Sequence, residues 1–459
     1  MGTFLIILQV VIVLGCLLLG THYGGVGLGL ISGIGLALLV FFFQLPPGEP
    51  PIDVMLTILA VIGCASVLQT IGGLDVMMKY AEKLLRKHPT RVTILAPLTT
   101  WFLTVLCGTG HVVYTMFPII EDISLSKNIR PERPMAVSSV AAQMGITASP
   151  VSVAVVSMAT ILAKEAGITG VAFSIPQILM VSIPSSFLGV LLAAFWSLRR
   201  GKDLDKDPEF QKLISDPVKR AYVYGGDEGA TLQDKVFPKQ AYWAVGIFFT
   251  AIALVVVLGA FDGIRPHFPN ASGQPTVLSM TLVIQMMMLV SGAVIMVACK
   301  VKMSEVPNSA VFKAGMSAIF SVFGVAWMAE TFFHAHLDSL MASLAGIVQA
   351  YPVFYAVTLF LVSKLVNSQA AAVTAFVPVG LRLGVDPVTI VGFFGAAYGY
   401  FVLPTYPSDL AAIGFDRSGT TRIGKFIINH SFLIPGFICV ITSCLVGTMT
   451  PRTGRLRWM

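Results

Sequence analysis

The chain has 459 residues, of which 56% are hydrophobic and only 12% are charged, and its mean hydropathy is +0.83. Soluble domains carry about 25% charged residues, so these values exclude a cytosolic enzyme, and the chain is too apolar to be disordered. The net charge of +7 comes from short basic segments beside apolar stretches, which indicates membrane topology rather than nucleic-acid binding. We therefore predict an all-α polytopic membrane protein that contacts lipid and binds no nucleic acid.

Apolar stretches of membrane-spanning length follow one another along most of the chain. The first lacks a basic leader and a small-residue cleavage site, so we expect a retained span. Residues 199–240 are polar, with charges of both signs that nearly cancel, which is typical of a solvated linker. Regions 92–122 and 353–383 are apolar but are interrupted near the middle by small and polar residues. The expected spans are residues 4–20, 24–43, 53–72, 135–163, 175–197, 241–260, 276–298, 312–333, 388–412 and 426–448.

The two halves of the chain repeat each other. TILAVIGCASVLQTIGGLD at 57–75 resembles AIFSVFGVAWMAETFFHAHLD at 318–338. Each interrupted region then reaches a proline, at Pro118 or at Pro378, and the sequences GITASP and GYFVLP follow with the same spacing from Gly to Pro. Short matches that agree in order and in spacing indicate an internal repeat, which is a frequent feature of transporters.

The distribution of basic residues indicates how the two repeats are related. The segment after the third span is basic, whereas its counterpart, residues 335–352, has no Lys or Arg. The positive-inside rule places the first segment in the cytoplasm and the second outside, so we predict that the repeats have inverted topology. The basic residues of the first segment are Lys79, Lys83, Arg86, Lys87 and Arg91.

The two interrupted regions are predicted to be re-entrant helical hairpins. Region 92–122 has basic residues on both flanks, so both of its ends are expected on the cytoplasmic side. Its tip would be residues 107–111, and the equivalent tip of region 353–383, entered from outside, would be residues 367–369. The predicted domains are a first inverted repeat (1–198), a cytoplasmic linker (199–240) and a second inverted repeat (241–459), with about five spans and one hairpin in each repeat.

The hairpin tips and two interrupted spans, residues 135–163 and 388–412, point to one binding site. Non-helical backbone at membrane depth is tolerated where it lines a cavity or is buried in protein. Helix N-termini at such a place favour an anion, and hydroxyl and amide groups add neutral hydrogen bonds. The candidate substrate-binding residues are Gly108, Thr109, Gly110, His111, Thr147, Ser149, Lys364, Asn367, Ser368, Gln369, Thr405, Ser408 and Asp409.

Each of these candidates also has a purely structural alternative. Lys364 lies three residues before Asn367 and is a candidate partner of a substrate carboxylate, but it could instead form an ion pair with Asp409 or Glu330. The tip glycines could serve helix packing, the hydroxyls could bond to their own helix carbonyls, and the histidine could be merely packed. We find no nucleophile–base pair, metal-ligand motif or nucleotide loop in a fitting context, so we expect neither an enzyme nor a metal site.

Several long segments resemble one known family. CGTGHVVYT, NIRPERPMA, QMGITASPVSVAVVS, SKLVNSQAAA, LPTYPSDLAAI and FDRSGTT are similar, nearly letter for letter, to the bacterial anaerobic C4-dicarboxylate transporters of the Dcu family. The resemblance implies a multi-pass carrier of the bacterial inner membrane for fumarate, succinate, malate and aspartate. The implied activity is fumarate/succinate exchange, or proton-linked uptake, during anaerobic growth.

The resemblance also implies an architecture and partners. The family is similar to the wider group of ion transporters, which use two opposed hairpins and elevator motion in a homodimer. Some relatives act together with a dicarboxylate sensor kinase, so such a kinase is one candidate partner, and no cofactor is implied beyond a coupling proton or Na⁺. The alternative from a different class is a cation/proton antiporter with Asp409, Glu330 and His111 as its relay.

Overall fold

The structure is a computed structural model, and it describes most of the chain. The described residues are 2–23, 25–165, 173–225, 232–233, 235–269, 275–404, 406–425 and 428–449.

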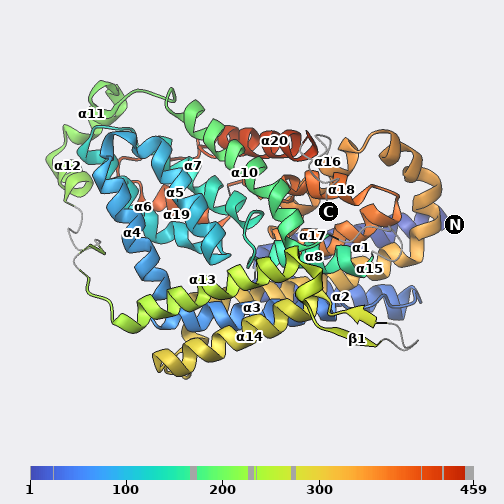
Figure 1. The fold of residues 1–459 in the computed structure, drawn as a ribbon. Coiled ribbons are helices and arrows are strands. Elements are labelled where there is room, and N and C mark those ends of the chain that lie inside the picture. Colours follow the sequence, from blue (N-terminus) through green and yellow to red (C-terminus); the bar gives the residue numbers. More distant parts are fainter. Residues whose placement is uncertain are drawn as a thin grey trace.

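Helices make up nearly all of the first half of the chain (Figure 1). The second helix continues as a π-helical turn at Leu38–Phe42, and short 3₁₀ turns lie at Pro89–Arg91 and Gly110–Val112. The helices are α1 (Gly2–Tyr23), α2 (Gly25–Ala37), α3 (Ile52–Thr70), α4 (Gly73–Lys87), α5 (Val92–Cys107), α6 (Val113–Ser126), α7 (Glu132–Ile146), α8 (Val153–Lys164) and α10 (Ile175–Ser197).

The linker and the second half are helical as well. A two-stranded antiparallel sheet, with His267 opposite Val277, is the only sheet of the described residues. Its strands are β1 (His267–Pro269) and β2 (Pro275–Val277). Further 3₁₀ turns lie at Leu204–Lys206, Asp262–Ile264, Val306–Asn308, Phe394–Ala397 and Tyr400–Val402. The helices are α11 (Pro208–Ile214), α12 (Pro217–Tyr224), α13 (Lys239–Ala260), α14 (Met280–Cys299), α15 (Ala310–Ala350), α16 (Val353–Val366), α17 (Gln369–Arg382), α18 (Pro387–Gly392), α19 (Pro407–Phe415) and α20 (Leu433–Met449).

The prediction of an all-helical protein with many membrane spans is confirmed. Among the described residues, six helical segments are long and apolar enough to cross a membrane. Within the same described residues, four shorter apolar helices lie where spans were expected, and a fifth, Val353–Val366, lies in the second expected hairpin, as the long segment Pro89–Cys107 lies in the first. The six segments are Ile52–Thr70, Pro89–Cys107, Ile175–Ser197, Lys239–Gly259, Thr281–Cys299 and Ala310–His336.

Two of the expected spans are divided in the structure. The stretch 135–163 is split into α7 and α8, and Pro150, which has no N–H donor, lies in the break. Ser152 starts α8, because its Oγ accepts a hydrogen bond from the N–H of Val155 at 3.2 Å. The stretch 388–412 is split into α18 and α19 by two 3₁₀ turns.

Two other boundaries differ from the expectation. The span was expected to end near residue 333, with the segment 335–352 on the external side of the membrane, but α15 continues as one helix to Ala350. The absence of basic residues there indicates a side of the membrane and does not oppose helix formation, and no proline occurs between Ala310 and Pro352. The last helix begins at Leu433 rather than near residue 426.

The helices form two groups that lie side by side (Figure 1). In the first group, α3 packs against α14 and α15, while α2 packs against α15. In the second group, α5 packs against α7, and α10 packs against α20. Helix α17 contacts α15 of the first group and also α8, which itself contacts α3 and α10.

Glycine allows the close crossing of α2 and α15. A Cβ atom at Gly29 would lie 1.9 Å from the backbone oxygen of Phe320, and one at Gly324 would lie 2.0 Å from the oxygen of Gly29. Small residues at helix crossings let backbones approach in a membrane, where apolar burial alone gives little attraction between helices.

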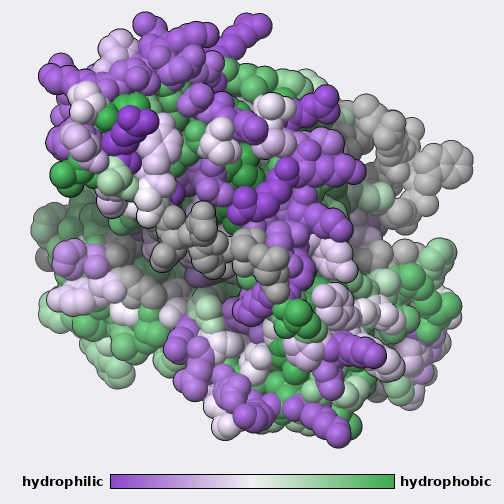
Figure 2. Space-filling view, turned by 90° about the vertical axis from the view of Figure 1, so that its left-hand side faces the viewer, coloured by the Kyte–Doolittle hydropathy of each residue, from purple (hydrophilic) through white to green (hydrophobic). Residues whose placement is uncertain are grey.

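One end of the molecule is strongly polar. Figure 2 shows hydrophilic side chains gathered over the end that carries α11 and α12, with hydrophobic side chains on the flanks. The long helices α3, α13 and α14 run toward this end in Figure 1. The polar end therefore lies along the helix axes, where a spanning protein meets water.

Candidate functional site

A cavity of about 150 Å³ lies where the two predicted tips meet. Residues 107–111, the first tip, line it from the loop between α5 and α6. Residues 367–370, which contain the second tip, line it from the junction of α16 and α17. Tyr400 and Tyr406 contribute from the divided region before and at the start of α19. Since a water molecule takes up about 30 Å³ of liquid, the cavity has room for about five waters or a small solute.

The backbone at Gly108 determines the shape of the first tip. Gly108 ends α5 with φ at +73°, and its N–H donates to the oxygen of Thr104 at 2.8 Å. A Cβ atom there would lie 2.7 Å from the backbone oxygen of Val151, in the break between α7 and α8. The left-handed conformation and the close approach both favour glycine.

Polar groups follow Gly108 along the first tip. The Oγ1 atom of Thr109 lies 2.7 Å from Nδ1 of His111 and accepts the backbone N–H of His111 at 3.3 Å. Gly110 packs against Gln143, because a Cβ atom at Gly110 would lie 2.6 Å from the Nε2 atom of that side chain. The first turn of the helix that continues as α6 therefore begins at the cavity.

The second tip has the same construction. Asn367 ends α16 with φ at +47°, and Ser368 starts α17 with its Oγ accepting the N–H of Ala371 at 3.3 Å. Lys364 lies behind this tip and not on the cavity wall. Its Nζ atom donates to Oδ1 of Asn367 at 3.2 Å and to the backbone oxygen of Tyr400 at 3.4 Å, and both of these residues line the cavity.

Gln143 and Tyr400 connect the tips, and the sequence prediction missed both. Nε2 of Gln369 donates to the backbone oxygen of Gln143 at 2.8 Å and to the hydroxyl of Tyr400 at 3.3 Å. The Tyr400 hydroxyl donates in turn to Oε1 of Gln143 at 2.7 Å. All three side chains are buried. Gln143 opens the segment QMGITASP and Tyr400 lies in GYFVLP, so polar residues beside the repeated motif were an available signal.

Two candidates from the first divided span do not line the cavity. Thr147 donates its hydroxyl to the backbone oxygen of Met144 at 2.8 Å, and Ser149 accepts the N–H of Val151 at 3.3 Å. Both side chains are buried and support the local backbone, which is the structural alternative stated for hydroxyl groups. A binding role for these two residues stays a prediction.

Asp409 and Ser408 lie together, away from the cavity wall. Ser139 of α7 donates its hydroxyl to Oδ1 of Asp409 at 2.7 Å, and its Oγ lies 2.9 Å from the Oγ of Ser408, which can donate to it. Asp409 is 1% exposed, and its Oδ2 atom has no hydrogen-bond partner among the residues that the structure describes. Thr405 lies outside the described residues.

Glu330 belongs to a different cavity. It pairs with Arg382 at 2.7 Å, and both line a larger cavity of about 860 Å³ together with His334 and Lys164. His111 lines the first cavity and Glu330 the second, so the relay of the alternative antiporter is not assembled at one place. The structural alternative in which Lys364 pairs with Glu330 does not occur either, because Glu330 pairs with Arg382.

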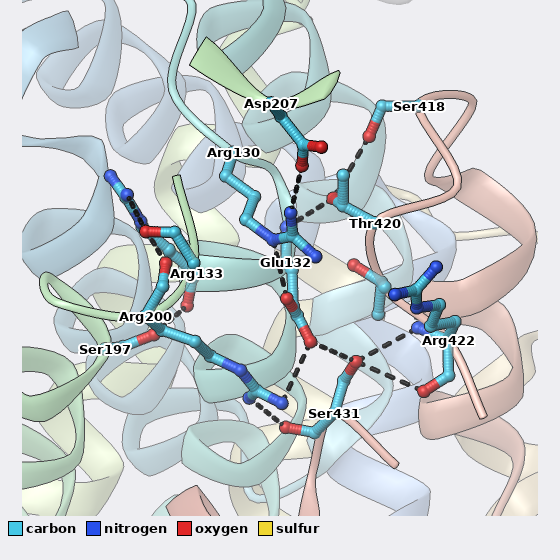
Figure 3. A network of polar contacts seen from close by, with 12 residues as sticks. Arg130, Glu132, Arg133, Ser197, Arg200, Asp207, Ser418, Thr420, Arg422 and Ser431 are labelled. Atoms are coloured by element: carbon cyan, nitrogen blue, oxygen red, sulfur yellow. Dashed lines mark hydrogen bonds and ion pairs between the residues drawn. The ribbon is translucent and has the colours of Figure 1, made fainter. Parts of the chain in front are cut away.

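A second polar cluster accounts for two of the long family-like segments (Figure 3). Glu132, at the start of α7, pairs with Arg130 at 2.7 Å and with Arg200, after α10, at 2.9 Å. Its Oε1 atom accepts the hydroxyl of Ser431 at 2.7 Å, and Arg130 also pairs with Asp207 of the linker. NIRPERPMA and FDRSGTT therefore belong to a network that joins α7, α10, the linker and the loop before α20, and neither segment lines the first cavity.

These features define a class of protein. Apolar helices of spanning length accompany two helix–loop–helix units whose loops line one cavity, which is the arrangement of a multi-span membrane transporter. The chain belongs to the family of anaerobic C4-dicarboxylate membrane transporters, whose model matches residues 5–453. The predicted family is thereby confirmed, and it is a family of transporters and not of enzymes.

Individual relatives agree with this assignment. The anaerobic C4-dicarboxylate transporter DcuB of Shigella flexneri is 55% identical over 96% of this chain and 97% of its own length. The C4-dicarboxylate transporter DcuA of Wolinella succinogenes is 36% identical over 96% and 98%. DcuA of Escherichia coli strain K12 is 35% identical over the same shares.

Two solved transporters share the fold. The Alcanivorax borkumensis YdaH transporter has a TM-score of 0.57 at 15% identity and covers 92% of this chain and 89% of its own. Neisseria gonorrhoeae MtrF, described as illuminating a class of antimetabolite efflux pumps, has a TM-score of 0.57 at 14% identity over 92% and 85%. At such low identity these likenesses establish the arrangement of the helices alone.

Proposed function

We propose that the protein is a secondary carrier of C4-dicarboxylates in the bacterial inner membrane, with fumarate, succinate, malate and aspartate as its substrates. The substrate class is supported by the family and by the names of the relatives. The single observation that carries the proposal is that both tips, with their hydroxyl, amide and imidazole groups, line one small cavity among the helices. The transport mode is exchange of external fumarate for internal succinate, or uptake with protons, in anaerobic cells.

A dicarboxylate brings two negative charges into this cavity, and each needs a partner. The helical segments that lead into α6 and α17 begin at the two tips, where their free N–H groups and positive dipole ends favour carboxylates. Lys364 supplies the cation of the site, since its ammonium contacts two residues of the cavity wall. Thr109 and Ser368 add hydroxyl groups from opposite tips.

Helix packing supports the proposed pair of inverted repeats, each with about five spans and one re-entrant hairpin. The repeat of 57–75 by 318–338 makes α3 the counterpart of α15, and the preceding helices α2 and α14 then correspond. Under this exchange the packed pair α2–α15 becomes α14–α3, which is also packed. The same correspondence relates α10 to α20, and these two helices pack against each other.

Two ion pairs bear on the proposed elevator motion. Arg86 of α4 pairs with Asp122 of α6 at 2.9 Å, and Glu330 of α15 pairs with Arg382 of α17 at 2.7 Å. Asp122 and Arg382 occupy equivalent positions, four residues after Pro118 and Pro378. Movement of the hairpins relative to α4 and α15 would break both pairs, one in each repeat.

Site-directed labelling tests the proposed topology. Single cysteines that replace Lys83 and Lys127, both exposed, should react with an impermeant maleimide only from the cytoplasm, because both ends of the first hairpin lie there. A cysteine that replaces the exposed Tyr351 should react only from outside. Labelling of the first two from opposite sides would contradict the hairpin and the inverted repeat together.

Counterflow in proteoliposomes tests the proposed activity. Liposomes loaded with succinate should accumulate labelled succinate, and external fumarate, malate or aspartate should compete, whereas the longer glutarate should not. Proton or cation flux without any dicarboxylate, together with an absence of counterflow, would favour the antiporter alternative. The homodimer and the partnership with a sensor kinase remain proposals that rest on the family resemblance.

A further inference from the structure

One buried acceptor of a cavity-lining side chain has no partner within the part of the chain that the structure describes. Gln369 is 3% exposed and lines the cavity. Its Oε1 atom has no hydrogen-bond donor among the residues that the structure describes. Buried polar atoms are nearly always hydrogen-bonded, so an unpaired acceptor on a side chain that lines a binding cavity calls for a partner that the described residues do not supply.

The orientation of the Gln369 amide follows from its neighbours. Its nitrogen lies 2.8 Å from the backbone oxygen of Gln143, which can only accept a hydrogen bond. The same nitrogen lies 3.3 Å from the hydroxyl of Tyr400, whose own proton is donated to Oε1 of Gln143 at 2.7 Å. Reversing the amide would place two acceptors against each other at Gln143, so the free atom is the oxygen.

The missing partner must be a donor, and this separates the C4-dicarboxylates into two kinds. Succinate and fumarate carry carboxylates and C–H groups and have no strong donor when they are fully ionised. Malate has a hydroxyl and aspartate an ammonium group at carbon 2, and both donate. Only substrates of the second kind can satisfy Oε1 of Gln369.

We propose that Gln369 determines specificity, because its Oε1 atom accepts a hydrogen bond from the 2-ammonium or 2-hydroxyl group of aspartate or malate. Its Nε2 atom holds the side chain in place through Gln143 and Tyr400, so the acceptor is fixed before the substrate arrives. This inference rests on the proposed function and adds to it the residue that recognises the substituent. Unsubstituted acids bind through their carboxylates alone and leave Oε1 unpaired.

A series of substrates of nearly equal shape tests the wild-type protein. L-Aspartate, L-malate and (S)-2-methylsuccinate differ at carbon 2 by an ammonium, a hydroxyl or a methyl group. Competition with labelled succinate in counterflow should show aspartate and malate binding at least about tenfold more tightly than methylsuccinate, as one buried hydrogen bond allows. Equal affinity of methylsuccinate and malate would overturn the proposal without any mutation.

Two variants then localise the effect. Gln369→Met keeps the length of the side chain and removes the acceptor, so it should reduce the preference for aspartate over methylsuccinate by about tenfold or more. Gln369→Glu keeps an acceptor; the loss of the Nε2 hydrogen bonds and the added negative charge should weaken binding of every acid, but the preference for aspartate over methylsuccinate should remain. If Gln369→Met weakens all acids by the same factor, the residue is a general positioning group and the proposal fails.

The outcome of this test is separable from the fate of the proposed function. If no C4 acid competes with succinate in the wild-type protein, the transport activity itself is refuted. If all of them compete and the preference does not depend on Gln369, only the specificity role is refuted. If Gln369→Met does not fold, the wild-type series and Gln369→Glu still decide.

Discussion

Replacing Gly108 by alanine should weaken the binding of succinate by straining the first tip. The new Cβ atom meets two obstacles, a φ of +73° and the backbone oxygen of Val151 at 2.7 Å. The left-handed conformation costs an alanine about 1–2 kcal/mol, and overpacking against an atom that cannot rotate away adds about 1–3 kcal/mol. A shift of the tip relieves this strain, and the tip lines the cavity, so the affinity for succinate should fall by about tenfold or more.

Two other glycines provide matched controls for this substitution. At Gly110 a Cβ atom would meet the end of the Gln143 side chain at 2.6 Å, which can move, so Gly110→Ala should have a smaller effect. At Gly63 in α3 nothing lies within 4 Å of the added Cβ, so Gly63→Ala should be neutral or slightly stabilising. Succinate affinity from ligand-dependent thermal shift, with protein level as the folding readout, should rank the three in this order. Wild-type affinity in folded Gly108→Ala would refute the reasoning.

Three further changes test other parts of the site. Lys364→Ala should abolish exchange in a folded protein, and Lys364→Arg should also fail because a planar fork does not replace a point charge; recovery of transport on adding Asp409→Ala would instead show a structural ion pair. Ser368→Ala removes the cap of α17 and should weaken succinate binding by about 1 kcal/mol in a binding titration, and unchanged affinity would return this hydroxyl to a packing role. Arg382→Glu places two carboxylates against each other at a half-buried position and should lower the free energy of unfolding by about 1–3 kcal/mol. Adding Glu330→Arg restores opposite charges and should restore stability in a thermal melt, and no recovery would show that the ion pair is incidental.

Much of the fold follows from the sequence because lipid imposes simple rules. A span must be long and apolar, and a break must contain residues that tolerate irregular backbone, such as Gly108 or Asn367 with their positive φ angles. These local signals identified the helices, the tips and the divided spans. The helical continuation of α15 to Ala350 was missed, because charge indicates the side of a membrane and not the local backbone conformation.

The contacts within the site depend on distant partners and could not be predicted in the same way. Gln143 meets Gln369 across 226 positions of the sequence, and Glu330 meets Arg382 across 52. Nothing near either residue indicates its partner. Thr147 shows the opposite case, in which a local contact competes with the predicted role. Its hydroxyl donates to the backbone oxygen of Met144, three residues earlier, instead of lining the cavity.

The central claim is that one substrate is held by both tips at once, and cysteine protection tests it most directly. Thr109→Cys and Ser368→Cys, each in a background without the native cysteines, place a thiol on opposite walls of the cavity. Saturating succinate should slow the reaction of a membrane-permeant maleimide with both thiols, while glutarate should protect neither. Protection of one thiol alone, or of neither by succinate in a protein that still performs counterflow, would contradict a shared site between the two tips.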